Sequence, residues 1–295
     1  MDQAARNSFI TAQSEAADRV EVTLDQLLPK DSMLADAMRY ACLGGGKRLR
    51  ALLVLEGAKL FNAPHKAAER AAAAVECIHA YSLIHDDLPA MDDDDMRRGK
   101  PTLHKAWDEA TAILAGDALQ TLAFSTLTAP QLMLEPNLKL KLCHTLAEAS
   151  GANGMVGGQM MDIAAERLDG KLSLEEIKEL QSMKTGALIS WAAEAGPLMG
   201  RKTPGAISDY AKNLGLAFQI QDDVLDVIGS PDVTGKATQK DGEAGKATFV
   251  SLMGLENAQK EARRLVDAAL EAIAPYGSAG NVLRGIAQFA INRDS

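Results

Sequence analysis

Residues 79–99 read HAYSLIHDDLPAMDDDDMRRG, and this stretch decides how the chain is interpreted. It completes the segment AAAAVECIHAYSLIH of residues 71–85, which is apolar on most sides and therefore predicts a buried helix. Within that helix His79, Ser82 and Asp86 lie on one stripe, because residues three, four and seven positions apart share a helix face. Since unpaired buried carboxylates are costly, such a stripe predicts a polar cavity or bound cations.

A second acidic helix, LGLAFQIQDDVLDVIG at residues 214–229, has the same character. Gln219, Asp222 and Asp226 share one stripe, and apolar residues occupy the neighbouring faces. The candidate metal ligands of the two clusters are Asp86, Asp87, Asp92, Asp222, Asp223 and Asp226. Carboxylates without a nearby set of Cys or His residues at metal spacing favour a hard cation such as Mg²⁺.

The spacing of Asp86 and Asp92 does not fit a straight helix. Six residues rotate the chain by about 240°, so the two side chains would face apart. Pro89 lies between them and removes a helix hydrogen bond. We therefore expect the helix to break there and Asp92 to swing back toward Asp86.

The charge of such a site indicates its ligand. Four carboxylates and a diphosphate carry about −4 and −3, against about +6 from three Mg²⁺ ions. A metal-bridged diphosphate nearly balances this site and is a good leaving group, since the metals absorb charge as its C–O bond breaks. The basic residues near the acidic motifs are Arg97, Arg98, Lys184, Lys236 and Lys246. Farther upstream, Lys47 and Arg50 are three residues apart and share a helix face.

Composition excludes several classes of protein. The chain has 295 residues, 47% of them hydrophobic, and a formal net charge of −9. This charge argues against a nucleic-acid binder. Its three cysteines are far apart and odd in number, so reduced thiols and a cytoplasmic location are expected. With no signal-peptide pattern and no apolar run near 18 residues, no membrane insertion is expected.

The whole chain has a helical texture. Aromatic residues are only 4%, and two-residue alternation is scarce, so we predict an all-α protein. Helical periodicity covers residues 32–43, 47–61, 66–88, 108–128, 138–150, 173–196, 205–228, 247–273 and 280–292. No break is long enough for a linker, which predicts one domain over 1–295. Residues 229–246, rich in Gly and Lys, form either a solvated surface loop or a mobile lid over an anionic ligand.

Taken in order, the motifs resemble those of the trans-prenyltransferases, or isoprenyl diphosphate synthases, and most of all the bacterial farnesyl diphosphate synthases. The motifs are GGGKRLR, HAYSLIHDDLPAMDDDDMRRGKPTLH, AGDALQTLAF, GGQMMD, KTGALI and AFQIQDDVLD, within about residues 40–250. The resemblance implies a homodimer whose subunit is an all-α bundle around a deep central cavity. It also implies Mg²⁺-dependent, head-to-tail condensation of isopentenyl diphosphate with dimethylallyl or geranyl diphosphate to give farnesyl diphosphate, with three Mg²⁺ ions for which Mn²⁺ could substitute.

The resemblance further implies individual roles. Asp86, Asp92 and Asp222 would bind Mg²⁺, and Asp87, Asp223 and Asp226 would be ligands or their partners. The allylic diphosphate would be held by Arg97, Lys184, Gln219 and Lys236, with Lys246 as a further substrate-binding residue. Isopentenyl diphosphate would be held by Gly46, Lys47, Arg50, His79 and Arg98. Thr185 and Gln219 would face the carbocation. Gln159 and Asp162 are secondary candidates, and Asp117 is expected at a helix start.

Product length is predicted to depend on Tyr81 and Ser82. Tyr81 lies about 7.5 Å below Asp86 along the helix axis, where a ring can form the floor of the cavity. The alternative is that Tyr81, which is rotated away from Asp86, packs against a neighbouring helix.

Other functions stay open at this point. A geranylgeranyl or geranyl diphosphate synthase would share every motif. A terpene cyclase would share the cavity and one aspartate motif. Its second metal motif typically contains Asn, Ser and Glu, whereas this chain has DDVLD, and it has no use for a second anion site. A non-enzymatic helical scaffold leaves the two acidic stripes unexplained.

Overall fold

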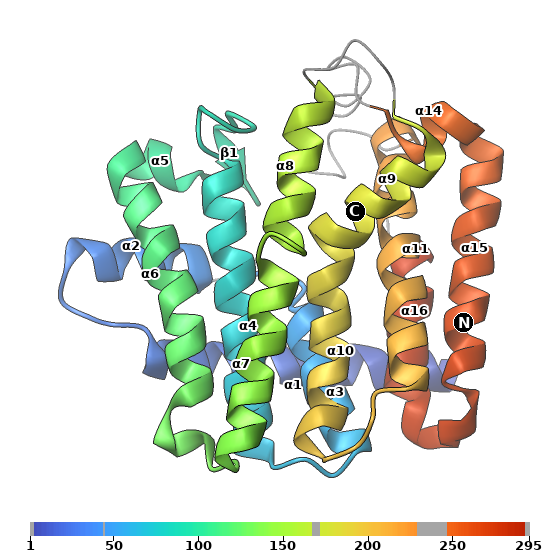
Figure 1. Ribbon diagram of the computed structural model, residues 1–295, viewed down its shortest axis with the longest axis horizontal. Coiled ribbons are helices and arrows are strands. Elements are labelled where there is room, and N and C mark those ends of the chain that lie inside the picture. Colours follow the sequence, from blue (N-terminus) through green and yellow to red (C-terminus); the bar gives the residue numbers. More distant parts are fainter. Residues whose placement is uncertain (1–2, 44, 167–171, 229–246, 293–295) are drawn as a thin grey trace. The chain divides into compact units, whose positions relative to one another are not determined.

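A computed structural model describes residues 3–43, 45–166, 172–228 and 247–292 (Figure 1). Over these ranges the regular structure consists of helices and the two strands of one short hairpin, which confirms the all-α prediction. None of the helices described is long and apolar enough to cross a membrane. The lid predicted at 229–246 lies outside the described residues.

The chain divides into two compact units, each assembled from separate stretches. We call Ile10–Thr145 with Ala195–Thr203 the amino-terminal unit, and Met1–Phe9, Leu146–Glu194 with Pro204–Ser295 the carboxyl-terminal unit. Each unit is described by itself below. The single domain around a central cavity stays a prediction.

The amino-terminal unit is built around the buried helix that the sequence predicted. Its elements, some of which extend beyond the unit, are α1 (Gln3–Leu27), α2 (Met33–Cys42), α3 (Leu49–Leu60), α4 (His65–Asp86), β1 (Met96–Arg97), β2 (Lys100–Pro101), α5 (Leu103–Ala106), α6 (Glu109–Thr128), η1 (Pro130–Leu132) and α7 (Pro136–Ser150). Helix α4 packs between α3 and α6, and its run Ala71–Ala74 is fully buried. The small alanine side chains let the neighbouring helices approach on several sides at once.

The hairpin after α4 was not predicted. Met96 pairs with Pro101 and Arg97 with Lys100 in an antiparallel register. The two residues between the strands, Arg98 and Gly99, have φ values of 53° and 75°. Positive φ at both central positions is the geometry of tight two-residue hairpins, and Gly favours it. This turn reverses the chain directly after the first acidic cluster.

The carboxyl-terminal unit centres on the second acidic helix. Its elements are α8 (Met155–Glu166), α9 (Leu174–Gln181), the π-turn η2 (Ser182–Gly186), most of α10 (Ala187–Met199), α11 (Ala206–Ile228), α14 (Phe249–Met253), α15 (Leu255–Ala272), η3 (Ala274–Gly280) and α16 (Asn281–Asn292). Helices α11 and α15 run side by side (Figure 1), and both also contact α16. Buried Tyr210 of α11 donates a hydrogen bond to the carbonyl of Leu283 at 2.8 Å, which ties α11 to α16.

The predicted helices differ from the observed ones in several places, among them the one predicted over 247–273, which Gly254 divides into α14 and α15. Helices α1 and α8 were missed, although Ala16, Val20 and Leu24 of α1 are buried at four-residue spacing. The helix predicted over 173–196 is interrupted by η2, because a π-turn leaves no mark in the hydrophobic period. The break expected at Gly196 is also wrong, since α10 continues to Met199 and contains Pro197.

Gly196 explains why that helix continues. A Cβ atom there would lie 2.2 Å from the backbone carbon of Gly57 in α3 and 2.3 Å from the nitrogen of Ala58. Only glycine permits this approach of two backbones. Tertiary packing therefore holds a helix across a residue that usually ends one.

Replacing Gly196 with Ala should destabilise the protein by about 1–3 kcal/mol, because two backbones must move apart. The matched control is Gly280→Ala, whose new Cβ would meet only ordinary contacts, the nearest at 3.5 Å. Thermal unfolding of both variants, followed by circular dichroism, measures the difference. Equal unfolding midpoints for the two variants would contradict the close approach.

Candidate active site

The first acidic cluster forms at the end of α4. The helix ends at Asp86, and the N–H of Asp92 donates to the Asp86 carbonyl at 2.8 Å. Leu88 precedes Pro89, a position that disfavours helical backbone, so the chain leaves the helix there. The break predicted from Pro89 is confirmed. The loop returns the backbone of Asp92, whose side chain is exposed, to the half-buried Asp86.

Asp87 and Arg97 pair with each other in this structure. Asp87 is only 3% exposed, and Nε of Arg97 donates to both its carboxylate oxygens, at 2.7 and 2.9 Å. Burial alone would lower the pKa of Arg97, but the hydrogen bonds to Asp87 raise it above its usual value. Asp87 was expected to be either a metal ligand or a partner of the site residues. This contact fits the second role, because Asp87 orients Arg97.

A group of cationic residues gathers beside this cluster. Arg98 donates to the carbonyl of Gly45 at 3.4 Å, and a Cβ atom on Gly46 would lie 2.6 Å from the Arg98 guanidinium. The pKa of half-buried His79 lies well below its usual value because its ring is desolvated and because Arg50 and Arg98 place positive charge near it. The structure therefore brings together most of the residues that were expected to hold the second diphosphate.

Lys47, the remaining member of that set, is exposed, and its backbone carbonyl accepts a hydrogen bond from the Gln13 side chain at 3.1 Å. Its side chain is thus at the surface of the same loop.

Arg48 is a structural residue that the sequence analysis did not single out. It is buried and donates to Glu76 of α4 at 3.0 Å, and Glu76 also accepts from the N–H of Ala51 at 3.1 Å. These bonds hold the first turn of α3 against α4 and so position Lys47 and Arg50. The signal in the sequence was Glu76, a lone acid within an alanine-rich buried helix.

In the carboxyl-terminal unit, close packing of α8 on η2 brings Lys184 to Asp162. A Cβ atom on Gly158 would lie 2.2 Å from the backbone nitrogen of Lys184, so glycine is needed there. Lys184 Nζ then lies 2.6 Å from Asp162 Oδ2. Lys184 and half-buried Thr185 both lie in the π-turn, a distortion that is frequent at functional sites.

Helix α11 carries the second acidic cluster. Asp222 and Asp226 are half-buried, while Asp223 is buried and accepts a hydrogen bond from the N–H of Phe249 at 2.7 Å. This bond ties the start of α14 to α11, so it gives Asp223 a structural role. Gln219 donates to the side chain of Gln181 at 2.7 Å.

Several other expectations have clear outcomes. Lys236 and Lys246 lie outside the described residues. Asp117 is not at a helix start: α6 begins at Glu109 with Asp108 as its N-cap, and Asp117 is exposed within the helix. Both polar side-chain atoms of Gln159 are buried without a hydrogen-bond partner among the described residues, which suits a residue that meets a ligand.

The chain-length candidates lie on α4. Tyr81 is 5% exposed and stacks edge-on against His85, with ring centroids 5.7 Å apart. Burial raises its pKa, and Gln120 of α6 lies beside its hydroxyl. Half-buried Ser82 donates to the carbonyl of His79 at 2.9 Å. The role of Tyr81 as a floor stays a prediction.

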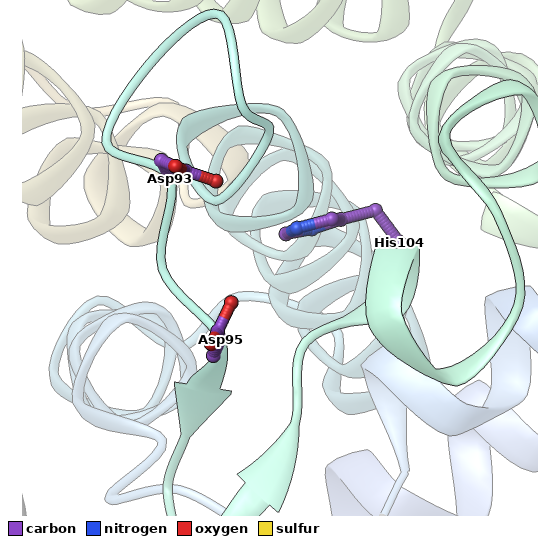
Figure 2. A group of neighbouring side chains, drawn as sticks. All are labelled: Asp93, Asp95 and His104. Carbon is purple, nitrogen blue, oxygen red and sulfur yellow. The ribbon is translucent and has the colours of Figure 1, made fainter.

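One acidic group was missed altogether. Asp93, Asp95 and His104 each present a ligand atom, and these atoms lie within 4.8 Å of one another (Figure 2). The sequence analysis found no histidine at metal spacing, because His104 is nine positions from Asp95. The Arg98-Gly99 turn was the available signal, since a two-residue hairpin brings the residues on either side of it together.

Comparisons with known proteins identify the family of the chain. The family model described as polyprenyl synthetase matches residues 31–276. The chain is 45% identical over 274 residues to farnesyl diphosphate synthase of Escherichia coli, covering 90% of this chain and 91% of that one. It is also 44% identical over 256 residues to chloroplastic geranylgeranyl pyrophosphate synthase 9 of Arabidopsis thaliana, covering 84% and 71% of the two chains.

A solved apo structure of a protein described as an FPP/GFPP synthase, from Zymomonas mobilis, superposes with a TM-score of 0.88 at 45% identity, covering 97% of this chain and 99% of that one. The chain therefore belongs to the polyprenyl synthetase family, has the all-helical isoprenoid synthase fold, and is a prenyltransferase.

The lowered pKa of His79 predicts how stability depends on pH. Below the ordinary histidine pKa of about 6.5, His79 binds a proton in the unfolded chain but stays neutral in the folded protein. This group therefore removes stability as the pH falls from about 6.5 toward its folded pKa, by up to about 1.4 kcal/mol per pH unit.

The variant His79→Gln should lose that dependence, and His144→Gln, at an exposed histidine of α7, should keep it. Urea unfolding of the parent and both variants between about pH 5 and 8 measures the effect. Parallel curves of unfolding free energy against pH for the parent and His79→Gln would contradict a lowered pKa of His79.

Proposed function

We propose that this prenyltransferase catalyses the Mg²⁺-dependent, head-to-tail condensation of isopentenyl diphosphate with dimethylallyl and geranyl diphosphate to give farnesyl diphosphate. One observation carries the proposal: the loop after α4 brings Asp92 back to Asp86 through a backbone hydrogen bond, next to the pair formed by Asp87 and Arg97. It combines oxygen ligands for a hard cation with an oriented guanidinium, and a diphosphate needs both.

The residues present fit Mg²⁺. Asp86, Asp92, Asp222 and Asp226 provide hard carboxylate oxygens of the kind that Mg²⁺ prefers. When bound, Mg²⁺ would neutralise the negative charge that develops on the departing diphosphate. Asp87 and Asp223 would act on this site through Arg97 and α14 rather than as direct ligands.

The second substrate would bind at the cationic group beside it. Arg50 and Arg98 supply charge, and the open backbone at Gly46 lets Arg98 lie against the loop. A neutral His79 can donate one hydrogen bond to a phosphate oxygen without adding charge. Exposed Lys47 would complete the site from the rim.

In the reaction, the allylic C–O bond breaks and its electron pair leaves with the diphosphate. The C4 carbon of isopentenyl diphosphate then attacks the allylic cation, and a proton leaves, with the released diphosphate as the proposed base. Lys184, oriented by Asp162, would hold the departing diphosphate together with Arg97. Thr185 and Gln219 would turn polar atoms toward the cation, and Lys236 and Lys246 would complete the diphosphate site.

The fifteen-carbon product is supported by two observations. Relatives from E. coli and Geobacillus stearothermophilus are named farnesyl diphosphate synthases. Tyr81 is also a large buried side chain on the helix that carries Asp86. The second candidate is a geranylgeranyl diphosphate synthase, since the Arabidopsis relative with 44% identity has that name.

The remaining parts of the proposal concern the assembly and its location. We propose one synthase domain that works as a homodimer in the cytoplasm. Helix α6 exposes Ile113 and Leu114, which are 44% and 57% accessible and suit a subunit interface. The free thiols Cys42 and Cys77 are buried, as expected for a reducing compartment.

Replacing Asp86 or Asp222 with Ala should lower turnover by about 100-fold or more, through lost stabilisation of the leaving group. Diphosphate release measures the rate, and in the parent it should require both isopentenyl diphosphate and an allylic partner. Asp267→Ala, at an exposed aspartate of α15, is the control and should keep the parent rate. Near-normal rates in correctly folded Asp86 and Asp222 variants would contradict the proposed metal-assisted departure of the diphosphate.

Tyr81→Ala should extend the product from fifteen to twenty or more carbons, because the buried ring would no longer block the growing chain. Tyr81→Phe is the matched control, since it keeps the buried ring and removes only the hydroxyl group. Reversed-phase analysis of products formed with excess isopentenyl diphosphate measures their length. If an active Tyr81→Ala enzyme still made a fifteen-carbon product, residues other than Tyr81 would limit the length of the product.

A further inference from the structure

The group of Asp93, Asp95 and His104 is separate from the carboxylates that the proposed reaction uses. Asp93 and Asp95 are exposed on the loop after Asp92, and His104 is buried in α5 at 7% exposure. In Figure 2 the imidazole ring points from α5 toward the two carboxylates. Two short-range features of the backbone create this convergence.

The first feature is the hairpin of β1 and β2. Its turn brings Thr102 back to Asp95, and the N–H of Thr102 donates to the Asp95 carbonyl at 3.0 Å. The second feature is the left-handed backbone of Asp93, with φ of 49°, which an aspartate tolerates better than most residues. Together they place both carboxylates opposite the start of α5.

The hydrogen bonds around His104 identify its free nitrogen. The Thr102 hydroxyl donates its only hydrogen to the Asp94 carbonyl at 2.7 Å. That hydroxyl can therefore only accept from Nδ1 of His104, which lies 3.2 Å away, so Nδ1 carries the ring proton. In the neutral ring the other nitrogen, Nε2, then has a lone pair, and Nε2 is buried without a hydrogen-bond partner in the described structure.

A buried nitrogen lone pair without a partner is costly, and a cation would remove the cost. Metal-binding histidines characteristically donate their second nitrogen to a neighbouring oxygen, as Nδ1 does here to Thr102. Imidazole with two carboxylates suits Zn²⁺ and similar transition ions, whereas Mg²⁺ prefers oxygen ligands alone. The donor set thus differs in chemical class from the Asp86 and Asp92 site.

We infer that Asp93, Asp95 and Nε2 of His104 form a binding site for one divalent transition-metal ion of the Zn²⁺ type, which links the loop after Asp92 to α5. Ligands on a tetrahedral Zn²⁺ lie about 3.4 Å apart. Ligand atoms that are up to 4.8 Å apart must therefore close by about 1.4 Å at most, and the two exposed aspartates can rotate to do so. Lys105 Nζ lies 2.9 Å from Oδ1 of Asp95, so Asp95 would bind the metal through Oδ2 or release Lys105.

The test uses the full-length protein, stripped of metal and then saturated with Mg²⁺ to fill the oxygen sites. Zn²⁺ is titrated in while long-range proton–nitrogen NMR spectra of the histidine rings are recorded. One equivalent should shift a single Nε2 resonance, and that resonance should be the one missing in His104→Gln. Asp93→Asn and Asp95→Asn should each weaken Zn²⁺ binding about 10-fold or more, judged by competition with a chelating dye.

Two controls separate this site from other effects. His144→Gln, at an exposed histidine of α7, should bind Zn²⁺ as the parent does. The aspartate variants change only exposed side chains, so they remain informative even if His104→Gln fails to fold. An unchanged His104 Nε2 resonance at saturating Zn²⁺, or parent-like affinity in Asp93→Asn and Asp95→Asn together, would overturn the inference.

Discussion

The first acidic cluster and the hairpin after it depend on one backbone hydrogen bond, from the N–H of Asp92 to the carbonyl of Asp86. A helix that continued past Asp86 would send the two carboxylates to different sides. Pro89 makes continuation costly, and the bond to Asp92 closes the loop that replaces the next turns. Because the chain leaves this loop near its starting point, the hairpin that follows can lay Arg97 against Asp87.

Buried carboxylates are the second constraint, and each has a particular partner. Asp87 is paired with Arg97, Glu76 accepts from Arg48 and Ala51, and Asp223 accepts from the N–H of Phe249. These pairs hold a hairpin, the start of α3 and the start of α14. Removing one member would leave a buried charge without compensation, so the pairs fix position more than they add stability. Acids that look alike in the sequence therefore differ in their surroundings: some are paired within the fold, and others are the residues proposed to bind cations.

The two proposed metal sites show that even adjacent aspartates can belong to different sites. Asp92 and Asp93 are neighbours, yet one turns back to α4 and the other faces α5. The positive φ of Asp93 separates them. A hard, oxygen-only donor set and a set that contains imidazole attract different ions, so both could be filled in one molecule without competition.

The sequence by itself determined the helical class, the buried α4 helix, its break at Pro89 and the two aspartate motifs. All of these follow from local periodicity and from a proline, which act within a few residues of the chain. Tertiary structure alone decided that Asp87 would orient Arg97, that Arg48 would be buried and that α10 would continue past Gly196. Each of these depends on contacts between residues far enough apart that no single turn or helix fixes their distance. Side-chain partners of this kind are chosen by packing and desolvation in the folded protein, and a pattern of residue types does not specify them.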